Sequence, residues 1–247
     1  MLTRLALVVA LATGCQHDLA DIDSIYYAGG ARGVHCAVDL DSKGNVGVTS
    51  IDGGLDRALA RNEVIELYAH HPGVTIPLST IEHVLAGAQE RGLAFNTYAD
   101  LAAGTWHAPG IALSFDDTSI AAWLDAMPMF EQYGARVTFF ISRYPLLKPT
   151  EHGWVAELAA AGHDIEAHSV LHLRAPQYVE DNGLQAYVDD EFQASIDALR
   201  ADGYPITTYA YPFGARTDEL DRTLLSHVKL LRSVTFTYEG VSSPCPY

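Results

Sequence analysis

The sequence predicts a single α/β domain, most simply a barrel, from three observations. From Val64 onward, short apolar runs alternate with longer stretches of helical spacing, which is typical of alternating β-strands and α-helices. No proline- or serine-rich linker and no internal repeat divides the chain. Nearly half of the 247 residues (49%) are apolar, which is enough to bury the core of one such domain.

The elements follow one another at short intervals. Helical spacing predicts helices at 79–89, 120–133, 154–161, 184–202 and 218–227. Ser79 and Glu82 have the spacing of a capping box, and Gly162 and Gly203 would each end a helix. The expected strands are the short apolar runs Val64–Ala69, Ile111–Phe115, Arg136–Ile141, Asp164–Ala167, Thr207–Ala210 and Leu230–Phe236.

The segment before the first of these strands shows no clear period. The glycine pairs Gly29-Gly30 and Gly53-Gly54 predict turns within it. We therefore interpret residues 15–62 as an N-terminal extension and residues 63–247 as the folded domain.

The first fifteen residues have the form of an export signal. Arg4 precedes an apolar run from Leu5 to Ala12, and small residues lead to Cys15. The run is shorter than the roughly 20 apolar residues that span a bilayer. We expect residues 1–14 to be a signal peptide and Cys15 to be the lipidated N-terminus of a cell-envelope lipoprotein. The alternative is an ordinary cleaved signal and a secreted protein.

Charge and cysteine content limit the partners and the compartment. The formal net charge of −16, with 15 Lys plus Arg, argues against nucleic acid, which is bound through clustered basic residues. Two further cysteines, Cys36 and Cys245, lie near opposite ends of the mature chain. In an oxidising compartment they could form a disulfide, or they could remain two free thiols.

Two adjacent carboxylates, Asp116 and Asp117, follow the apolar run Ile111–Phe115. Active sites of β/α barrels gather at the carboxyl ends of the strands, where one carboxylate can bind a metal and the other can face the substrate. The structural alternative is a strand end followed by a helix cap at Asp117 or Thr118. Taken alone, the pair favours that alternative.

A second polar cluster follows the strand Asp164–Ala167. His168 and His172 are four residues apart, so a tight loop or one helical turn can bring both imidazoles to one side. Together with one carboxylate they make a three-ligand set that leaves a coordination position open, as in catalytic zinc sites. Histidines at this spacing are often only surface residues, but combined with Asp117 they predict a metal site.

A third feature is the segment Tyr211-Pro212-Phe213-Gly214, at the end of a later strand. Proline fixes φ and glycine permits a turn, so the segment can place an aromatic wall and backbone amides beside a site. A plain β-turn is the alternative. Trp106 could also line a sugar groove or could belong to the core.

The segments SFDD (114–117), HSVLH (168–172) and YPFG (211–214), in this order, resemble three successive motifs of the polysaccharide deacetylases, carbohydrate esterase family 4. The similarity extends from Gly110 to about Arg216. The resemblance implies an irregular (β/α)7-type barrel. It also implies that Asp116 is the general base, that Asp117, His168 and His172 bind a divalent metal, and that Tyr211, Pro212, Phe213 and Gly214 line the substrate groove.

The sequence departs from the family pattern at two places. Members commonly have an arginine two residues before the motif proline, where it braces the base, but Ala210 stands here and Arg216 is the alternative. Members also have a Leu-x-His strand, with the general acid, well downstream of that proline. Leu225-Ser226-His227 has the letters but lies inside a predicted helix.

A better candidate for the acid lies upstream, at the end of the run Val64–Ala69. His70 fits the spacing best, with Tyr68 in place of leucine, and His71 is the alternative. This order resembles the circularly rearranged branch of the family, typified by bacterial poly-N-acetylglucosamine deacetylases. Because a barrel is closed, the strand reaches the same neighbourhood from either end of the chain.

The resemblance implies a metal-dependent hydrolase that removes acetyl groups from an extracellular or cell-envelope polysaccharide, most simply one that contains N-acetylglucosamine. The base Asp116 and the acid His70 would act beside the metal. Zinc fits two histidines and one aspartate, but cobalt, nickel and manganese fit as well. The alternative function is a catalytically silent, carbohydrate-binding lipoprotein with the same fold.

Overall fold

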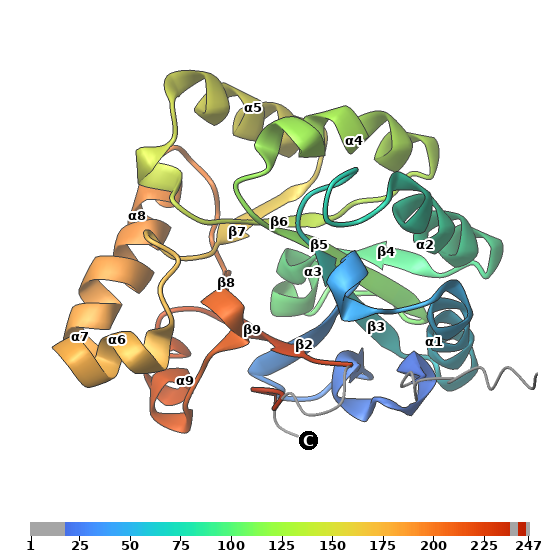
Figure 1. Ribbon diagram of the computed structural model, residues 1–247, viewed down its shortest axis with the longest axis horizontal. Helices are drawn as coiled ribbons and strands as arrows, with labels where there is room; N and C mark the ends of the chain where they lie inside the picture. The colour runs from blue at the N-terminus through green and yellow to red at the C-terminus, as the bar shows by residue number, and fades with distance from the viewer. Residues whose placement is uncertain (1–17, 238–241, 246–247) are drawn as a thin grey trace, which may run out of the picture.

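The computed structural model describes residues 18–237 and 242–245, and a closed barrel of parallel strands forms the centre of this part (Figure 1). Seven strands close the ring within the described residues, because β9 pairs with β2 through Val34–Val38 and Leu231–Thr235. The predicted (β/α)7-type barrel is therefore confirmed. In order around the ring the strands are β2 (Val34–Asp39), β3 (Val64–Ala69), β5 (Gly110–Asp117), β6 (Thr138–Ile141), β7 (Asp164–Ala167), β8 (Thr208–Ala210) and β9 (Leu230–Thr235).

Two short strands extend the sheet near the amino ends of barrel strands. β1 (Tyr26–Tyr27) runs antiparallel to β3, and β4 (Ala94–Asn96) runs parallel to β5. Helix α3 (Tyr98–Ala103) closes this end of the barrel, because the amides of Tyr98 and Ala99 donate to Thr138 and Asp164 at the starts of β6 and β7. The opposite end, where the strands finish, remains open for a site.

The remaining helices lie outside the barrel and bury their apolar faces against it (Figure 1). Helix α2 begins at Leu78 with Pro77 as its N-cap and has no side-chain capping bond, so the predicted Ser79–Glu82 capping box is wrong. The predicted helix 184–202 is present but contains a π-helical segment at 188–193. The helices are α1 (Val48–Arg61), α2 (Leu78–Glu90), α4 (Ile120–Gln132), α5 (Pro149–Ala160), α6 (Ala175–Asn182), α7 (Leu184–Tyr187), α8 (Ala194–Ala201) and α9 (Asp218–Leu224).

The segment interpreted as an N-terminal extension belongs to the barrel instead. Within 15–62, β2 lies between β3 and β9, and α1 packs outside β3. The turn predicted at Gly53-Gly54 is wrong, because both glycines lie inside α1. A Cβ on Gly54 would come within 2.8 Å of Ile65 Cδ1 and 3.1 Å of Leu19 Cβ. Glycine at this position therefore permits close packing of helix on strand rather than a turn.

Cys36 and Cys245 form a disulfide across 209 residues of sequence. Cys36 lies in β2, so the bond ties the end of the chain to the first strand of the barrel. The alternative of two free thiols is excluded in this structure. The predicted signal peptide 1–14 and Cys15 lie outside the described residues.

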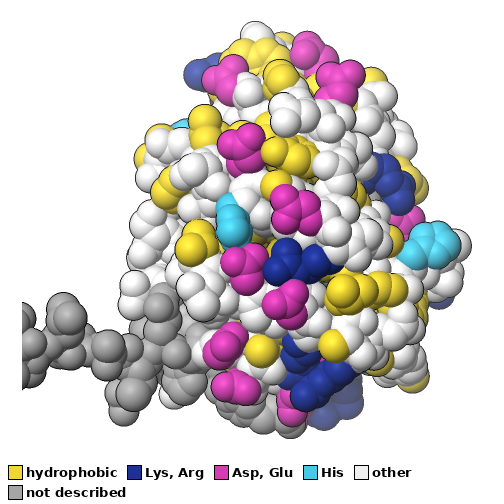
Figure 2. All heavy atoms as spheres, turned by 90° about the vertical axis from the view of Figure 1, so that its right-hand side faces the viewer, with side chains coloured by type: hydrophobic (Ala, Val, Ile, Leu, Met, Phe, Trp, Pro, Cys, Tyr) yellow, Lys and Arg dark blue, Asp and Glu magenta, His cyan; other side chains and the backbone are white. Residues whose placement is uncertain are grey.

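The outer surface carries charges of both signs. Figure 2 shows the face with α1 and α2, where acidic and basic side chains lie beside one another. Arg91 pairs there with Asp52 and Asp56. Within the described residues, no helix has the length and apolar character needed to cross a membrane.

Candidate active site

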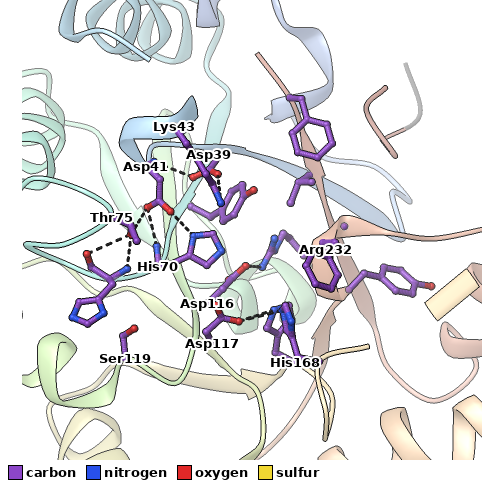
Figure 3. Close-up of a pocket in the computed structure, with 18 of the residues that line it drawn as sticks. Asp39, Asp41, Lys43, His70, Thr75, Asp116, Asp117, Ser119, His168 and Arg232 are labelled. Atoms are coloured by element: carbon purple, nitrogen blue, oxygen red, sulfur yellow. Dashed lines mark hydrogen bonds and ion pairs between the residues drawn. The ribbon is translucent and has the colours of Figure 1, made fainter. Parts of the chain in front are cut away.

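A cavity of about 480 Å³ opens at the carboxyl ends of the barrel strands (Figure 3). Polar side chains enter it from six of the barrel strands or from the loops that follow them. This arrangement is the usual one for an active site on a β/α barrel. The polar residues that line it include Asp39, Asp41, Tyr68, His70, Asp116, Asp117, His168, His172, Tyr211 and Arg232.

Asp117, His168 and His172 meet on one side of the cavity, as predicted. Their donor atoms all lie within 4.8 Å of one another. Asp117 Oδ1 lies 3.2 Å from His172 Nε2 and 3.7 Å from His168 Nε2. A carboxylate oxygen and two imidazole nitrogens converging in this way can serve as three ligands of a divalent ion.

Several backbone positions at this side of the cavity have left-handed conformations. Asp117, Ser169, His172 and Phe213 all have positive φ, between 58° and 83°. Such strain is costly for residues other than glycine and gathers at functional sites. At Asp117 it breaks the alternation of β5, so both adjacent carboxylates line the cavity. The helix-cap alternative is wrong, because Ser119 is the N-cap of α4 and makes no side-chain capping bond.

His168 is held in the orientation and the charge state that a metal ligand requires. Its Nδ1 donates to the carbonyl oxygen of Ala210 at 2.8 Å, so its Nε2 lone pair faces Asp117. Burial, together with the neighbouring His172, lowers the pKa of His168 to about 3. Burial also lowers the pKa of His172, although Asp117 opposes this shift. Both imidazoles are therefore neutral at neutral pH.

Asp116 lies beside this triad and is 2% exposed. Its Oδ2 forms an ion pair with Arg232 Nη2, whereas its buried Oδ1 has no hydrogen-bond partner within the described residues. Tyr68 and Phe140 flank the guanidinium of Arg232 at 4.9 and 5.0 Å from their ring centroids. One oxygen of Asp116 is thus fixed in place and the other is left available.

Arg232 occupies the place of the arginine that the family pattern has at position 210. β8 and β9 are neighbours in register, with Ala210 opposite Arg232. The alternative, Arg216, is wrong, because its guanidinium pairs with Asp221 and donates to the carbonyl oxygen of Pro244. Asp116 is therefore held in place by a side chain from β9, the strand next to β8.

His70 approaches the cavity from the opposite side to His168, and Asp41 lies behind it (Figure 3). His70 Nδ1 donates to Asp41 Oδ2 at 2.7 Å, and the carbonyl oxygen of His70 accepts from the Trp123 indole. Burial disfavours the imidazolium, but the hydrogen bond to Asp41 and the charges of Asp116 and Asp117 outweigh it, so the pKa of His70 is raised. His70 can therefore carry a proton near neutral pH.

His71 also lines the cavity, but within the described residues its ring has no carboxylate partner. Its hydrogen bonds there are those of its backbone, mainly with Thr75. Of the two adjacent histidines, His70 is thus the one oriented by a carboxylate. His227, at the other end of the barrel, packs against the Phe192 ring.

A second group, Asp39, Asp41 and His70, also meets the geometric requirement for a metal. Its atoms already have partners, however. Asp41 accepts from His70 and Thr75, and Asp39 accepts from the amide of Asp41 and faces Lys43. The chemistry of this group fits a hydrogen-bonded acid better than a ligand set.

The turn Tyr211–Gly214 borders the metal side of the cavity. Phe213 is 46% exposed and its ring lies 4.6 Å from that of His172. The Tyr211 hydroxyl is buried and donates to Asp221, and the Tyr211 amide donates to the carbonyl oxygen of Arg232. That amide is therefore unavailable to a substrate oxygen. Trp106 lies at the other end of the barrel, against Tyr27, and does not line the groove.

Sequence reasoning did not identify Arg232 or Asp41. Arg232 is the lone charge inside the apolar strand Leu230–Phe236, and an unexplained charge in a buried strand is a signal that could have found it. Asp41 gave no comparable signal, because it lies in a segment where no strand was expected.

Comparisons with known proteins identify relatives by sequence pattern and by fold. The family model described as "Polysaccharide deacetylase" matches residues 103–230. Among solved structures, IcaB from Ammonifex degensii is 18% identical with a TM-score of 0.57, over 74% of this chain and 89% of its own. Deacetylase PplD from Streptococcus pyogenes, solved with acetate, is 19% identical with a TM-score of 0.51, over 73% and 93%. The BpsB deacetylase domain from Bordetella bronchiseptica is 15% identical with a TM-score of 0.53, over 90% and 94%.

At these identities the structural matches establish the fold. A search of curated proteins found no significant match. The family model stops short of Asp41, His70 and Arg232, so the roles of these residues depend on the geometry above.

Proposed function

Since the chain belongs to the polysaccharide deacetylase family, we propose that it is a metal-dependent hydrolase that removes acetyl groups from an N-acetylglucosamine-containing polysaccharide of the cell envelope. One observation carries the proposal. A three-ligand set, a carboxylate with an available oxygen and a carboxylate-oriented imidazole all line a single cavity.

Asp117, His168 and His172 would hold the metal. Two neutral imidazoles and one carboxylate are typical of catalytic zinc, although cobalt, nickel and manganese accept the same donors. A divalent ion bound there would polarise the acetyl carbonyl group and acidify water. The Ala210 carbonyl supports this role because it fixes the tautomer of His168.

Asp116 would act as the general base. Its Oδ1, which has no hydrogen-bond partner within the described residues, would accept a proton from the attacking water, while the ion pair with Arg232 keeps the other oxygen in place.

His70 would act as the general acid and protonate the departing sugar amine. Asp41 orients the ring through Nδ1, which leaves Nε2 as the proton donor. Protonation is favoured because the pKa of His70 is raised. The upstream position of its strand, similar to that in poly-N-acetylglucosamine deacetylases, favours an N-acetyl over an O-acetyl substrate.

The decisive experiment compares Asp116→Asn with wild type on acetylated glucosamine oligomers. We expect acetate release to fall by about a hundredfold to ten-thousandfold, the usual contribution of a general base. Metal content, measured by mass spectrometry, should not change. The matched control is Asp181→Asn, at a surface carboxylate of α6, which should keep full activity. Full turnover by Asp116→Asn would overturn the assignment.

The alternative function, a silent carbohydrate-binding protein, predicts a different result. Wild type would then bind the oligomers but release no acetate with zinc, cobalt, nickel or manganese. Activity that is lost with a chelator and restored by metal would exclude this alternative.

We also propose that the protein is exported and anchored through a lipid on Cys15. The proposal is supported by the signal-like residues 1–14. Labelled fatty acid should be incorporated into the wild type but not into Cys15→Ser. An unlabelled wild-type protein in the culture medium would instead indicate an ordinary cleaved signal.

A further inference from the structure

A column of buried polar groups lies inside the barrel beneath the candidate active site. Glu66 on β3, Tyr98 at the start of α3 and Arg232 on β9 are each fully buried. His35 on β2 joins them, because its Nδ1 lies 2.8 Å from Glu66 Oε1 and its ring 6.4 Å from that of Tyr98. At its upper end the column meets Asp116 through Arg232.

Several atoms of this column have no hydrogen-bond partner within the described residues. They are Glu66 Oε2, Tyr98 Oη, and Arg232 Nε and Nη1. Buried polar atoms in folded proteins are nearly always paired, either with protein or with ordered water. Leaving such an atom unpaired destabilises the folded state, and more so when the group is charged.

These atoms belong to one neighbourhood. The Tyr98 ring and the Arg232 guanidinium both lie against Phe140, at 5.1 and 5.0 Å from its ring centroid. Burial raises the pKa of Tyr98 well above its ordinary value, and the charge of Glu66 and its interaction with the hydroxyl raise it further, so Tyr98 keeps its proton. The groups are complementary, since Glu66 accepts, Arg232 donates and the Tyr98 hydroxyl can do both.

The side chains opposite these groups on the neighbouring strands are small. Ala112 is the partner of Glu66 across β3 and β5, and Ala210 is the partner of Arg232 across β8 and β9. Several complementary buried polar atoms are the partners that an ordered water needs.

The guanidinium of Arg232 is fixed on its other sides by protein. Tyr68 and Phe140 contact its faces, and its Nη2 pairs with Asp116. Within the described residues, its Nε and Nη1 each have no hydrogen-bond partner. Whatever binds these two donors therefore helps to decide where Arg232 holds the catalytic carboxylate.

We propose that the barrel binds ordered water between Glu66, Tyr98 and the unpartnered donors of Arg232, and that Glu66 is thereby a positioning residue for Asp116. Glu66 touches no substrate and acts through Arg232. The positioning role rests on the proposed deacetylase function, whereas the water site does not.

The water site is tested by high-resolution crystal structures of the wild type and Glu66→Gln. In the wild type we expect density for water within hydrogen-bond distance of both Glu66 and Arg232. In Glu66→Gln, whose amide nitrogen cannot accept, the water should move or be lost and the Arg232 side chain should shift. A dry interior in the wild type, or an unmoved Arg232 in the variant, would overturn the inference.

The positioning role is tested by kinetics on acetylated glucosamine oligomers. We expect Glu66→Gln to lower kcat about tenfold, with KM changed by less than about twofold, because small displacements of a catalytic group slow the chemical step. Tyr98→Phe, which removes a single hydroxyl, should lower kcat in the same way. Metal content should be unchanged in both variants.

Glu166→Gln is the matched control. Glu166 is also fully buried inside the barrel, but Thr207 and Thr208 satisfy its carboxylate. This variant should lower the melting temperature and leave the kcat of the folded enzyme within about twofold of wild type. Equal kcat losses in Glu66→Gln and Glu166→Gln, or wild-type kcat in Glu66→Gln and Tyr98→Phe, would refute the positioning role. If Glu66→Gln does not fold, Tyr98→Phe decides the question.

The two proposals fail in different ways. A wild-type protein that releases no acetate refutes the proposed function, but the crystal structures still decide whether water binds beneath Arg232. An active wild type with a dry barrel refutes only the inference about Glu66.

Discussion

The two sides of the cavity differ in how the chain encodes them. The metal side consists of Asp117, His168, His172 and the turn 211–214, which all lie inside the segment that the family model matches. The acid side and the brace of the base come from Asp41, His70 and Arg232, which all lie outside it. The residues of the metal side thus belong to short sequence motifs. The residues of the other side come together because the barrel closes.

This difference shows why the missing motif arginine does not leave the base unsupported. Position 210 holds alanine, but the strand beside it supplies a guanidinium to the same carboxylate. A side chain that is absent from a motif can therefore be replaced by one from a neighbouring strand. The predictions below test each side separately.

The largest effect is expected on the metal side. Asp117→Ala removes the carboxylate ligand and should abolish stoichiometric metal binding, with activity reduced by at least about a thousandfold, because the ion contributes several kcal/mol. Metal analysis and acetate release measure both effects. Asp39→Asn, from the second acidic group, is the control and should keep its metal. If Asp39→Asn lost its metal and Asp117→Ala kept it, the metal would be bound by the second acidic group instead.

The next effect concerns the brace of the base. Arg232→Met leaves the buried Asp116 without its partner, so we expect kcat to fall about a hundredfold and the free energy of unfolding to fall by about 3–5 kcal/mol. Kinetics and thermal unfolding test this. The double variant Ala210→Arg with Arg232→Ala moves the guanidinium to the motif position and should recover part of kcat. A fully active Arg232→Met would show that the base needs no brace.

A smaller effect is expected for the acid. Asp41→Asn removes the carboxylate that raises the pKa of His70, so the pKa of His70 should fall. Because the acid must be protonated, the basic limb of the kcat/KM profile should move to lower pH. The acidic limb should stay in place, and His71→Ala should leave both limbs unchanged. A basic limb unaffected by Asp41→Asn would mean that another group donates the proton.

The smallest effect on activity is expected for the disulfide. Cys36→Ser with Cys245→Ser should lower the free energy of unfolding by up to about 5 kcal/mol, the chain-entropy value for so long a loop. Metal binding should persist, because Asp117 lies at the end of β5 and His168 and His172 lie in the loop after β7, away from the disulfide. Thermal unfolding measures the loss of stability, and metal titration measures metal binding. If the variant lost its metal at room temperature, the metal site would depend on the disulfide, contrary to this prediction.

Much of the fold could be predicted from the sequence. The expected strand Val64–Ala69 coincides with β3, because a mostly apolar run is typical of a buried strand, and Asp164–Ala167 coincides with β7 although Asp164 and Glu166 are acidic. β2 was not expected. Its inward positions carry His35 and Asp39, whose polarity hides the strand pattern although both side chains are buried.

The meeting of Asp117, His168 and His172 was likewise predicted, because each lies at or shortly after the end of a recognisable strand. Arg232 could not be assigned in the same way. Its partner Asp116 lies 116 residues away in sequence, and the two meet only because β9 closes the barrel against β2. The Asp41–His70 pair is also formed between two strands, one of which had not been expected.

Ala210 illustrates a consequence for the evolution and engineering of this protein. Its carbonyl oxygen orients His168, and its methyl group leaves space for the guanidinium of Arg232. The side chains tolerated at position 210 should therefore depend on the residue at position 232, so the two positions are epistatic. A scan of single substitutions would score position 210 as intolerant, whereas a library that varies both positions together would recover active combinations.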